Sequence, residues 1–304
     1  MPLKPFFCIA LLLIQLPVTA VSGESGFDLE RLEKQRILAR AQSYLLADPI
    51  TVTAHRAERS EGGIHDFYSE GDYWWPDPDN PNGPYIRRDG LSNPDNFVAH
   101  RHAMTRLSDV VGTLVSAYLL TQDAEYATQA HNHLEAWFVD ESTRMNPSLL
   151  YGQAIKGRVT GRSIGIIDTI HLVEVARGAK ILDDSGALPE GSLAGVKQWF
   201  SEYLAWLQTH PYGQRERTHP NNHGVCWSMQ AAAFAELLGD AEVLEWVRNQ
   251  FKTVYLPEMM NEKGGFPAEL ARTKPYGYSL FVLDAMATVA QIASHPGDDL
   301  WSYQ

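Results

Sequence analysis

The sequence contains only two cysteines, Cys8 and Cys226, among its 304 residues. Cys8 lies in a predicted N-terminal targeting segment, so the mature chain keeps Cys226 alone. A single cysteine cannot form an internal disulfide, even in an oxidising compartment. We therefore expect a hydrophobic core to stabilise the fold, and a mature chain of about 280 residues is long enough to bury one.

Basic residues are also scarce. The chain has 25 Lys and Arg against 37 Asp and Glu, which gives a net charge of −12. Nonspecific binding to duplex nucleic acid depends on Lys and Arg that release counterions, so this charge argues against a nucleic-acid partner. An acidic protein can still carry a local basic cleft, and an anionic substrate therefore remains compatible with the composition.

Long apolar runs are absent except near the N-terminus. There, residues 6–16 are apolar apart from Gln15, Lys4 precedes them and Val18-Thr19-Ala20 follows. This pattern predicts a signal peptide over residues 1–22 and a periplasmic or secreted protein. A membrane anchor is disfavoured because the run is too short to span a hydrocarbon core of ~30 Å. No Pro- or Ser-rich linker divides residues 23–304, so we expect them to form one domain. We also expect the mature protein to be a monomer and to be free of the membrane once the signal peptide is cleaved.

Strands with alternating Val and Ile are few, and helical periodicity dominates. Gly239-Asp240 and Gly186 end predicted helices. The pattern predicts an all-α fold of antiparallel helix hairpins around an axis, and the lack of a strict repeat disfavours a repeat solenoid. The predicted helices cover residues 27–47, 98–120, 124–138, 164–182, 193–207, 223–238, 241–254 and 279–293.

Four connections are long: residues 51–97, 140–162, 209–222 and 255–278. A compact helical scaffold does not need such loops, and loops of this length usually carry function. We therefore expect them to form the walls of one cleft.

The segment His219-Pro-Asn-Asn-His-Gly224 directly precedes a predicted apolar helix. Asn is a good N-cap, so one of the two asparagines is accounted for by ending the helix. The other amide, the imidazole and the positive end of the helix dipole would together suit an anion.

Residues 264–278 place Arg272, Tyr276 and Tyr278 in a loop that enters the last helix. Arg offers a planar fork to a carboxylate, and a nearby Tyr can donate a proton or, if cations lower its pKa, accept one. The alternative is a surface loop whose tyrosines pack against the core.

A third segment, residues 146–169, contains Gln153, Arg162 and Asp168. We expect Gln153 and Arg162 to face a cleft and Asp168 to orient a neighbour or cap a turn. Gly161 and Gly165 resemble a phosphate loop only superficially, because no strand precedes them and the spacing is incomplete.

Histidine pairs invite a metal interpretation at His100-x-His102 and His131-x-His133. Residues two apart on a helix point away from each other, so we predict neither a metal nor another cofactor. Glu258 and Glu262 form a carboxylate pair that could serve a glycosidase, but nothing in the sequence distinguishes them from solvated acids.

Five motifs occur in one order along the chain: YWWPDP (73–78), MNPSLLYGQAIKG (145–157), GRSIGIIDT (161–169), NNHG (221–224) and GFPAELARTKPYGYSLF (265–281). Taken together, they resemble the alginate lyase family of polysaccharide lyases. The resemblance implies an α/α toroid, an incomplete barrel of antiparallel helix hairpins with long cleft-forming loops. It also implies a catalytic centre of Asn222, His223, Arg272 and Tyr278, with Tyr276 as a competitor for Tyr278. Members of the family usually continue with more helix beyond the position of Gln304, so the resemblance predicts an open toroid, shortened at its C-terminal end.

The resemblance implies β-elimination on a polyuronate. Our first expectation is mannuronate-containing alginate, and the sequence leaves polyguluronate and glucuronan open as substrates. Two other classes remain open, a helical-toroid glycoside hydrolase and a noncatalytic polyuronate-binding protein. For substrate binding we expect stacking on sugar faces by aromatic residues and contacts to carboxylates or hydroxyls by polar ones. These residues are Tyr73, Trp74, Trp75, Arg87, Arg88, Gln153, Arg162 and Tyr276.

Overall fold

The computed structural model describes residues 29–303, and its main elements are α-helices. The predicted signal peptide, residues 1–22, lies outside the described residues. Within residues 29–303, no helix combines the length and the apolar character needed to cross a membrane. The helices are α1 (Leu29–Tyr44), α2 (Ala99–Thr121), α3 (Ala124–Phe138), α4 (Leu172–Ser185), α5 (Ala194–Thr209), α6 (Pro211–Arg217), α7 (Asn222–Leu238), α8 (Ala241–Gln250), α9 (Pro267–Leu270) and α10 (Pro275–Ala293).

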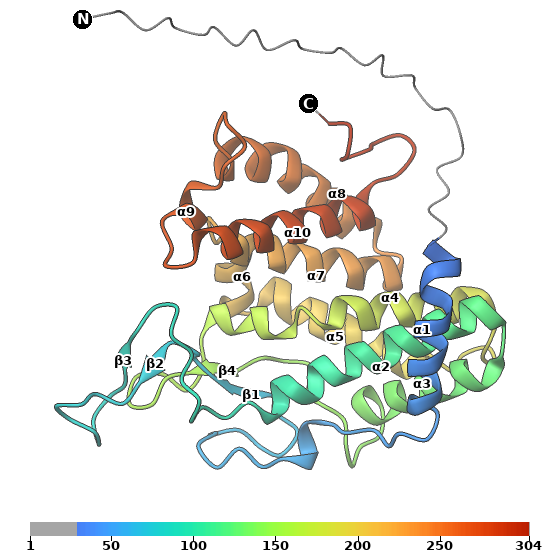
Figure 1. Cartoon of the computed structure of the whole chain (residues 1–304), viewed down its shortest axis with the longest axis horizontal. Helices are drawn as coiled ribbons and strands as arrows, with labels where there is room; N and C mark the ends of the chain where they lie inside the picture. Colours follow the sequence, from blue (N-terminus) through green and yellow to red (C-terminus); the bar gives the residue numbers. More distant parts are fainter. Residues whose placement is uncertain (1–28, 304) are drawn as a thin grey trace, which may run out of the picture.

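The helices form two layers, which confirms the predicted all-α toroid. Figure 1 shows α2, α4, α7 and α10 lying side by side, and each contacts its neighbour in that order. In the second layer α3 packs on α2, α5 packs on α3 and α7, and α8 packs on α7 and α10. Short connections make antiparallel hairpins of α2 with α3 and of α7 with α8, the latter through Gly239 in the left-handed conformation and the N-cap Asp240.

Helix α7 is the centre of the core. All of its residues except His223, Glu236 and Leu238 are buried. A run of small residues, Ala231–Ala233 and Ala235, lets α4, α5 and α10 approach it closely. The buried Gln230 amide accepts a hydrogen bond from Thr169 (2.7 Å) and so ties α7 to the segment before α4.

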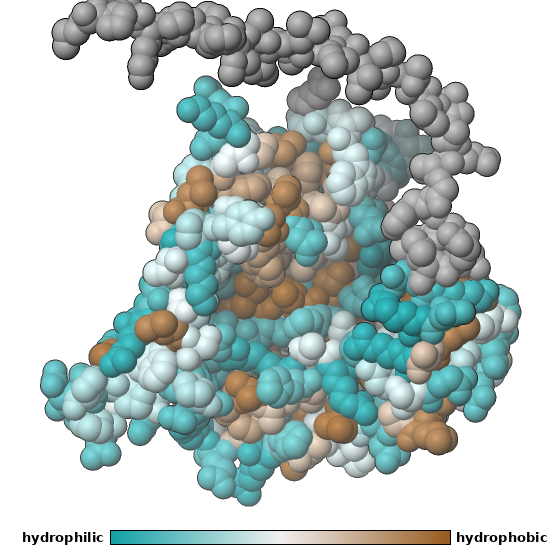
Figure 2. Space-filling view, in the orientation of Figure 1, coloured by the Kyte–Doolittle hydropathy of each residue, from teal (hydrophilic) through white to brown (hydrophobic). Residues whose placement is uncertain are grey.

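Two small sheets lie at one end of the helical layers (Figure 1). Strand β1 (Tyr68–Glu70) pairs in parallel with β4 (Tyr151–Ala154), and β2 (Trp74–Trp75) pairs antiparallel with β3 (Ile86–Arg87). These strands lie in the long connections 51–97 and 140–162, so the predicted loops contain short paired segments. In Figure 2 the β2–β3 segment is mainly hydrophilic, whereas apolar side chains gather over the α10 side of the same face, where Leu280 and Leu283 are exposed.

Two predicted elements differ from the structure in this region. The predicted helix 164–182 is divided into a 3₁₀ segment, η2 (Ser163–Thr169), and α4. The predicted loop 209–222 contains α6, which begins because the His210 side chain accepts a hydrogen bond from the Tyr212 amide and Pro211 takes the first helical position.

A third difference concerns the predicted helix 241–254. Its α-helical part, α8, ends at Gln250, and the chain continues as a π-helix, η3 (Phe251–Met259). Pro257 lies inside η3 and has no amide hydrogen to donate to the preceding turn. The π-helix η3, whose turns are wider than those of an α-helix, therefore extends helical structure into the predicted loop 255–278.

Glycines allow η2 to pack closely on β4. Gly165 packs directly on Gly152 of β4, and a Cβ atom at Gly165 would lie 2.5 Å from the Gly152 carbonyl carbon. A Cβ atom at Gly161 would lie 1.9 Å from the Leu150 carbonyl oxygen. These glycines therefore permit close backbone packing between β4 and η2, which is their role in place of phosphate binding.

We predict that Gly165→Ala lowers the free energy of unfolding by about 1–3 kcal/mol, because β4 and η2 must separate to admit the methyl group. Gly277→Ala is the matched control, since a Cβ atom there meets nothing within 4 Å. Denaturant unfolding of both variants measures the difference. Equal stability of the Gly165→Ala variant and the parent would contradict the tight contact.

Candidate active site

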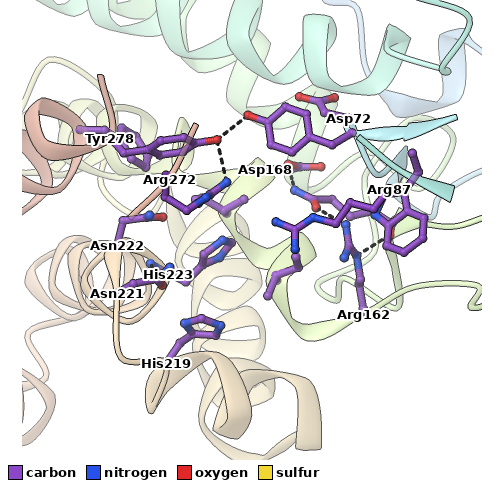
Figure 3. A pocket seen from close by; sticks show the side chains of 16 residues that line it. Asp72, Arg87, Arg162, Asp168, His219, Asn221, Asn222, His223, Arg272 and Tyr278 are labelled. Carbon is purple, nitrogen blue, oxygen red and sulfur yellow. Dashed lines mark hydrogen bonds between the residues drawn. The ribbon is translucent and has the colours of Figure 1, made fainter. Parts of the chain in front are cut away.

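One cavity, of about 480 Å³, opens where the β2–β3 segment, β4, η2, the α7 N-terminus and the start of α10 meet. It brings together residues far apart in the chain, such as Tyr73 and Tyr278, which are separated by 205 positions. Figure 3 shows Asn222, His223, Arg272 and Tyr278 on one wall, with Arg87, Arg162, Asp72 and Asp168 across from them. The predicted site residues that line the cavity are Tyr73, Trp74, Arg87, Gln153, Arg162, Asn222, His223, Arg272 and Tyr278.

Three predicted substrate-binding residues do not line this cavity. Tyr276 is 76% exposed and lies outside it. The Trp75 indole donates a hydrogen bond to the Leu91 carbonyl (2.9 Å), and the Arg88 guanidinium lies 5.4 Å from its ring centroid. Trp75 and Arg88 therefore pack against each other on the β2–β3 segment, and of the two tyrosines only Tyr278 is within the cavity.

Tyr278 is held by two neighbours at its hydroxyl. Its oxygen lies 2.5 Å from the Tyr73 hydroxyl and accepts a hydrogen bond from Arg272 Nη2 (2.9 Å), as Figure 3 shows. Burial, followed by the contact with Tyr73, raises the pKa of Tyr278 against the opposing effect of Arg272. The idea that cations lower this pKa is therefore wrong, and Tyr278 is a neutral phenol at neutral pH.

Asp89 holds both Arg272 of this wall and Arg87 of the opposite wall, and no sequence motif singled it out. Its carboxylate accepts hydrogen bonds from Arg87 (2.5 Å), Thr273 (3.0 Å) and Arg272 (3.2 Å). Burial alone would raise the pKa of Asp89, but these hydrogen bonds, with Arg272 first, lower it. The only sequence signal was its place two residues after Arg87, which does not reveal a contact with a loop 183 residues away.

The N-terminal turn of α7 carries the other two predicted catalytic residues. Asn221 is the N-cap, and its side chain accepts a hydrogen bond from the His223 amide (3.1 Å). The Asn222 backbone amide and side-chain Nδ2 both donate to Glu269 Oε1, each at 2.8 Å. His223 Nδ1 lies 2.5 Å from Glu216 Oε1. One asparagine therefore caps the helix, as predicted, and the next side chains face the cavity.

His219 also lines the cavity, although it was not among the predicted site residues. Its ring centroid lies 5.1 Å from that of His223, and its buried Nδ1 has no hydrogen-bond partner among the described residues. Burial, with a further contribution from His223, lowers the pKa of His219. We therefore expect His219 to be neutral at neutral pH.

The opposite wall contains an ordered polar network. Gln153 Nε2 donates to Asp168 (3.0 Å), and Arg162 donates to the Gln153 carbonyl (3.0 Å) and side chain (2.9 Å). Gln153 has a φ of 49°, an unusual conformation for a residue other than glycine. Asp168 therefore orients Gln153, which in turn orients Arg162. As expected, Gln153 and Arg162 face a cavity and Asp168 orients a neighbour.

The charges of this wall are unequally paired. Asp72 and Asp168 both face Arg101, at 2.5 Å and 3.4 Å. Among the described residues, no ion pair links Arg162 to a carboxylate. Burial lowers the pKa of Arg162 to about 10, so it is still charged at neutral pH. Arg162 is thus a cation in the cavity that is available to an anionic ligand.

The comparisons with known proteins agree with this geometry. The family model described as alginate lyase matches residues 51–304. An alginate lyase from Bacteroides ovatus is 34% identical, with a TM-score of 0.82 over 89% of this chain and 72% of that chain. The chain belongs to the alginate lyase family. It is therefore a polysaccharide lyase, and the family implies an anionic polysaccharide substrate.

More distant members of this alginate lyase fold are also similar. Alginate lyase A1-III from Sphingomonas species A1 is 17% identical, with a TM-score of 0.53 over 88% of this chain and 71% of that chain. A variant of alginate lyase A1-III complexed with a tetrasaccharide gives 17% identity and a TM-score of 0.56, again over 88% and 71%. None of the curated proteins matches the chain.

The histidine pairs considered for metal binding have other contacts in this alginate lyase family member. The His100 ring accepts from the Tyr68 amide (3.0 Å) and contacts the His55 carbonyl (2.8 Å), and His131 contacts the Ser192 carbonyl (3.0 Å). Residues 29–303 contain no group of three or more His, Cys, Asp or Glu arranged to hold a metal ion.

We predict that Asp89→Asn destabilises the protein by up to ~1 kcal/mol at neutral pH, because Asp89 is partly exposed and bridges two arginines. A carboxylate whose pKa is lowered by folding stabilises fully above its unfolded pKa of about 3.9, and the effect is lost as the pH falls through the folded pKa. Unfolding midpoints of variant and parent should therefore converge below about pH 4. The exposed Asp79 is the control: a pH-dependent loss of equal size in Asp79→Asn would contradict the assignment.

Proposed function

We propose that this enzyme cleaves a polyuronate, in the first place mannuronate-containing alginate, by β-elimination, leaving 4,5-unsaturated uronate ends. The observation that carries this proposal is the meeting of Asn222, His223, Arg272 and Tyr278 on one cavity wall. An amide, an imidazole, a guanidinium and a phenol are the donors and acceptors that such a reaction needs.

The reaction begins with removal of the C5 proton, which is weakly acidic while the adjacent carboxylate is charged. Negative charge then grows on that carboxylate as an enolate-like dianion. Arg272 and the amide hydrogen of Asn222 Nδ2 that is not used by Glu269 are placed to stabilise this charge. These donors are fixed in advance by Asp89 and Glu269, so they need little reorganisation during the reaction.

Tyr278 is the proposed acid. Burial raises its pKa, so it carries the proton that the leaving O4 must receive. The C5 proton goes to His223, which lines the cavity. Tyr278 could accept it only after losing its own proton, which its raised pKa disfavours. His223 can alternatively neutralise the substrate carboxylate.

The opposite wall is proposed to bind neighbouring sugars. Arg162 would meet the carboxylate of an adjacent uronate, because it has no carboxylate partner among the described residues. Trp74 lines the cavity, and the guanidinium groups of Arg158 and Arg162 lie 5.1 Å and 5.9 Å from its ring centroid. An aromatic face flanked by cations suits the apolar face and the charge of a uronate. Alginate lyase A1-III variants bind a tetrasaccharide, which supports a site for several sugars.

A hydrolase has less support. It would need two carboxylates free to act as acid and base. The cavity carboxylates Asp72 and Asp168 are both engaged by Arg101, and Glu258 and Glu262 are exposed residues that do not line the cavity.

The function is tested by incubating the purified protein with polymannuronate, polyguluronate and glucuronan and following ultraviolet absorbance. Only elimination forms the conjugated double bond that absorbs there. We expect an increase on polymannuronate. Reducing ends without absorbance would indicate a hydrolase, binding without cleavage would indicate a carbohydrate-binding protein, and an increase on another polymer alone would change the substrate.

We also propose that the protein acts as a monomer in the periplasm or outside the cell, after removal of residues 1–22. The support is the charged, apolar and small-residue pattern of that segment. N-terminal sequencing of protein from the periplasm and the medium tests cleavage, and light scattering tests the monomer.

We predict that Tyr278→Phe lowers kcat by ~10²–10⁴-fold while substrate binding is largely kept, because only the proton-transferring hydroxyl is removed. Tyr276→Phe is the matched control, since Tyr276 lies outside the cavity. Steady-state kinetics and binding of one defined oligouronate measure both effects. Loss of activity in Tyr276→Phe with retention in Tyr278→Phe would reverse the assignment.

We predict that Arg272→Ala lowers kcat by roughly 10²–10³-fold, because its interaction strengthens as charge develops. Arg87→Ala removes a second partner of Asp89 but no contact with Tyr278, so it should chiefly raise KM, and less so at high salt. Kinetics at two salt concentrations separate the roles. A normal kcat in Arg272→Ala would reduce Arg272 to a substrate clamp.

A further inference from the structure

Two carboxylates are buried beneath the first turn of α7. Glu216, on α6, has a relative exposure of 0%, and Glu269, on α9, of 1%. Each uses one oxygen to contact one predicted catalytic residue: Glu216 contacts His223, and Glu269 contacts Asn222. Nothing in the sequence motifs assigned a role to either residue.

The contact of Glu216 fixes the chemistry of the His223 ring. An ionised carboxylate only accepts hydrogen bonds, so Nδ1 of His223 must carry a hydrogen at their 2.5 Å separation. The other ring nitrogen, Nε2, has no hydrogen-bond partner among the described residues, and the ring lines the cavity. Glu216 thereby selects the tautomer in which Nε2 is offered to a ligand.

Glu269 acts on Asn222 in a similar way. Its Oε1 accepts from both the backbone amide and the Nδ2 group of Asn222, at 2.8 Å each. Because the carboxylate can only accept, the amide of Asn222 cannot be flipped. One Nδ2 hydrogen and the Oδ1 atom are left for the cavity.

The second oxygens of both carboxylates indicate that these contacts do not serve stability alone. Glu216 Oε2 and Glu269 Oε2 are buried and have no hydrogen-bond partner among the described residues. Burying a carboxylate with an unsatisfied oxygen is costly, and a hydrophobic or amide side chain would avoid part of that cost. Favourable interaction with the α7 dipole offsets some of it but does not require contact with these two side chains.

We propose that Glu216 and Glu269 are positioning residues, which orient His223 and Asn222 for the elimination reaction. The proposal rests on the proposed function, since it assigns His223 and Asn222 to the reaction. It differs from a helix-capping role, which would affect folding but not the tautomer of His223 or the rate of folded enzyme.

The test compares Glu216→Gln with Glu70→Gln. Glu70 is the matched control because it is also a buried carboxylate, with an exposure of 4%. Its partners are Arg59, Tyr68 and the Phe97 amide, and none of them is a predicted catalytic residue. We expect Glu216→Gln to lower kcat by roughly 10- to 100-fold with little change in KM, the size seen when an outer partner of a metal-bound histidine is lost. Glu70→Gln should lower stability but keep kcat per folded molecule.

Nitrogen-15 NMR of the histidine rings gives a second readout. The spectra are read at the high-pH plateau, where the ring shifts no longer change with pH and the neutral rings report their tautomer. We expect His223, assigned by its loss in His223→Ala, to carry its hydrogen on Nδ1 in the parent and to populate the Nε2–H form in Glu216→Gln. The glutamine amide can donate to Nδ1, which a carboxylate cannot do.

Unchanged kcat in Glu216→Gln, or an unchanged His223 tautomer, would overturn the proposal for Glu216. Equal loss of kcat in Glu216→Gln and Glu70→Gln, in proportion to unfolded protein, would also overturn it. If Glu216→Gln does not fold, Glu216→Asp shortens the reach to His223 while keeping the charge and is measured in the same way. If the parent forms no unsaturated product, the proposed function fails, and the tautomer measurement still decides whether Glu216 positions His223.

Glu269→Gln tests the second half of the proposal. Its amide oxygen can still accept from Asn222, so folding should be kept while the charge is lost. We expect a smaller loss of kcat than in Glu216→Gln. Glu269→Ala, which removes both the charge and the hydrogen bonds, is the comparison. If Glu269→Gln is no more active than Glu269→Ala, Glu269 supplies charge and not orientation, and the positioning role of Glu269 is overturned.

Discussion

The first turn of α7 is fixed by the burial of the whole helix behind it. Because α4, α5, α8 and α10 pack around α7, its N-terminus cannot shift without disturbing the core. Asn221 caps that N-terminus, and Glu216 and Glu269 hold the next two side chains from α6 and α9. The packed core thereby fixes the positions of the Asn222 amide and the His223 imidazole at the N-terminal end of α7. The helix dipole there favours an anionic substrate group.

The same principle governs the cations of this acidic protein. Arg272 and Arg87 share Asp89, and Arg101 holds Asp72 and Asp168, so most of the cavity charge is fixed by a buried or half-buried partner. Arg162 is positioned by the polar Gln153 instead. A polyuronate carboxylate can therefore pair with Arg162, while Arg87, Arg101 and Arg272 are already held in place by carboxylates. The net charge of −12 disfavours anions elsewhere on the protein.

The sequence was sufficient to predict what depends on periodicity and motif. Helix α3 was predicted at its observed bounds, and α2, α5 and α7 differ by one or two residues, because their apolar faces follow the helical repeat. His223, Arg272 and Tyr278 were expected to meet in one cleft because each lies at or beside a loop–helix junction. The structure confirms that they line one cavity.

The remainder depends on contacts that no local pattern encodes. The close packing of η2 on β4 depends on Gly165 against Gly152, and α6 begins at the His210 cap. Asp89, Glu216 and Glu269 are ordinary acidic residues in sequence, and only their partners from distant segments distinguish them. The raised pKa of Tyr278 likewise follows from burial and from Tyr73, which lies 205 residues away.

The central claim is that one uronate is held at the α7 N-terminus between Arg272 and Tyr278. A crystal structure of the Tyr278→Phe variant with a bound mannuronate oligomer tests it most directly. The account predicts that one sugar carboxylate contacts Arg272, His223 and Asn222, with O4 of that sugar beside residue 278. A carboxylate bound elsewhere, for example on the outer face of the β2–β3 segment beside Trp75 and Arg88, with the α7 wall free of sugar, would contradict it.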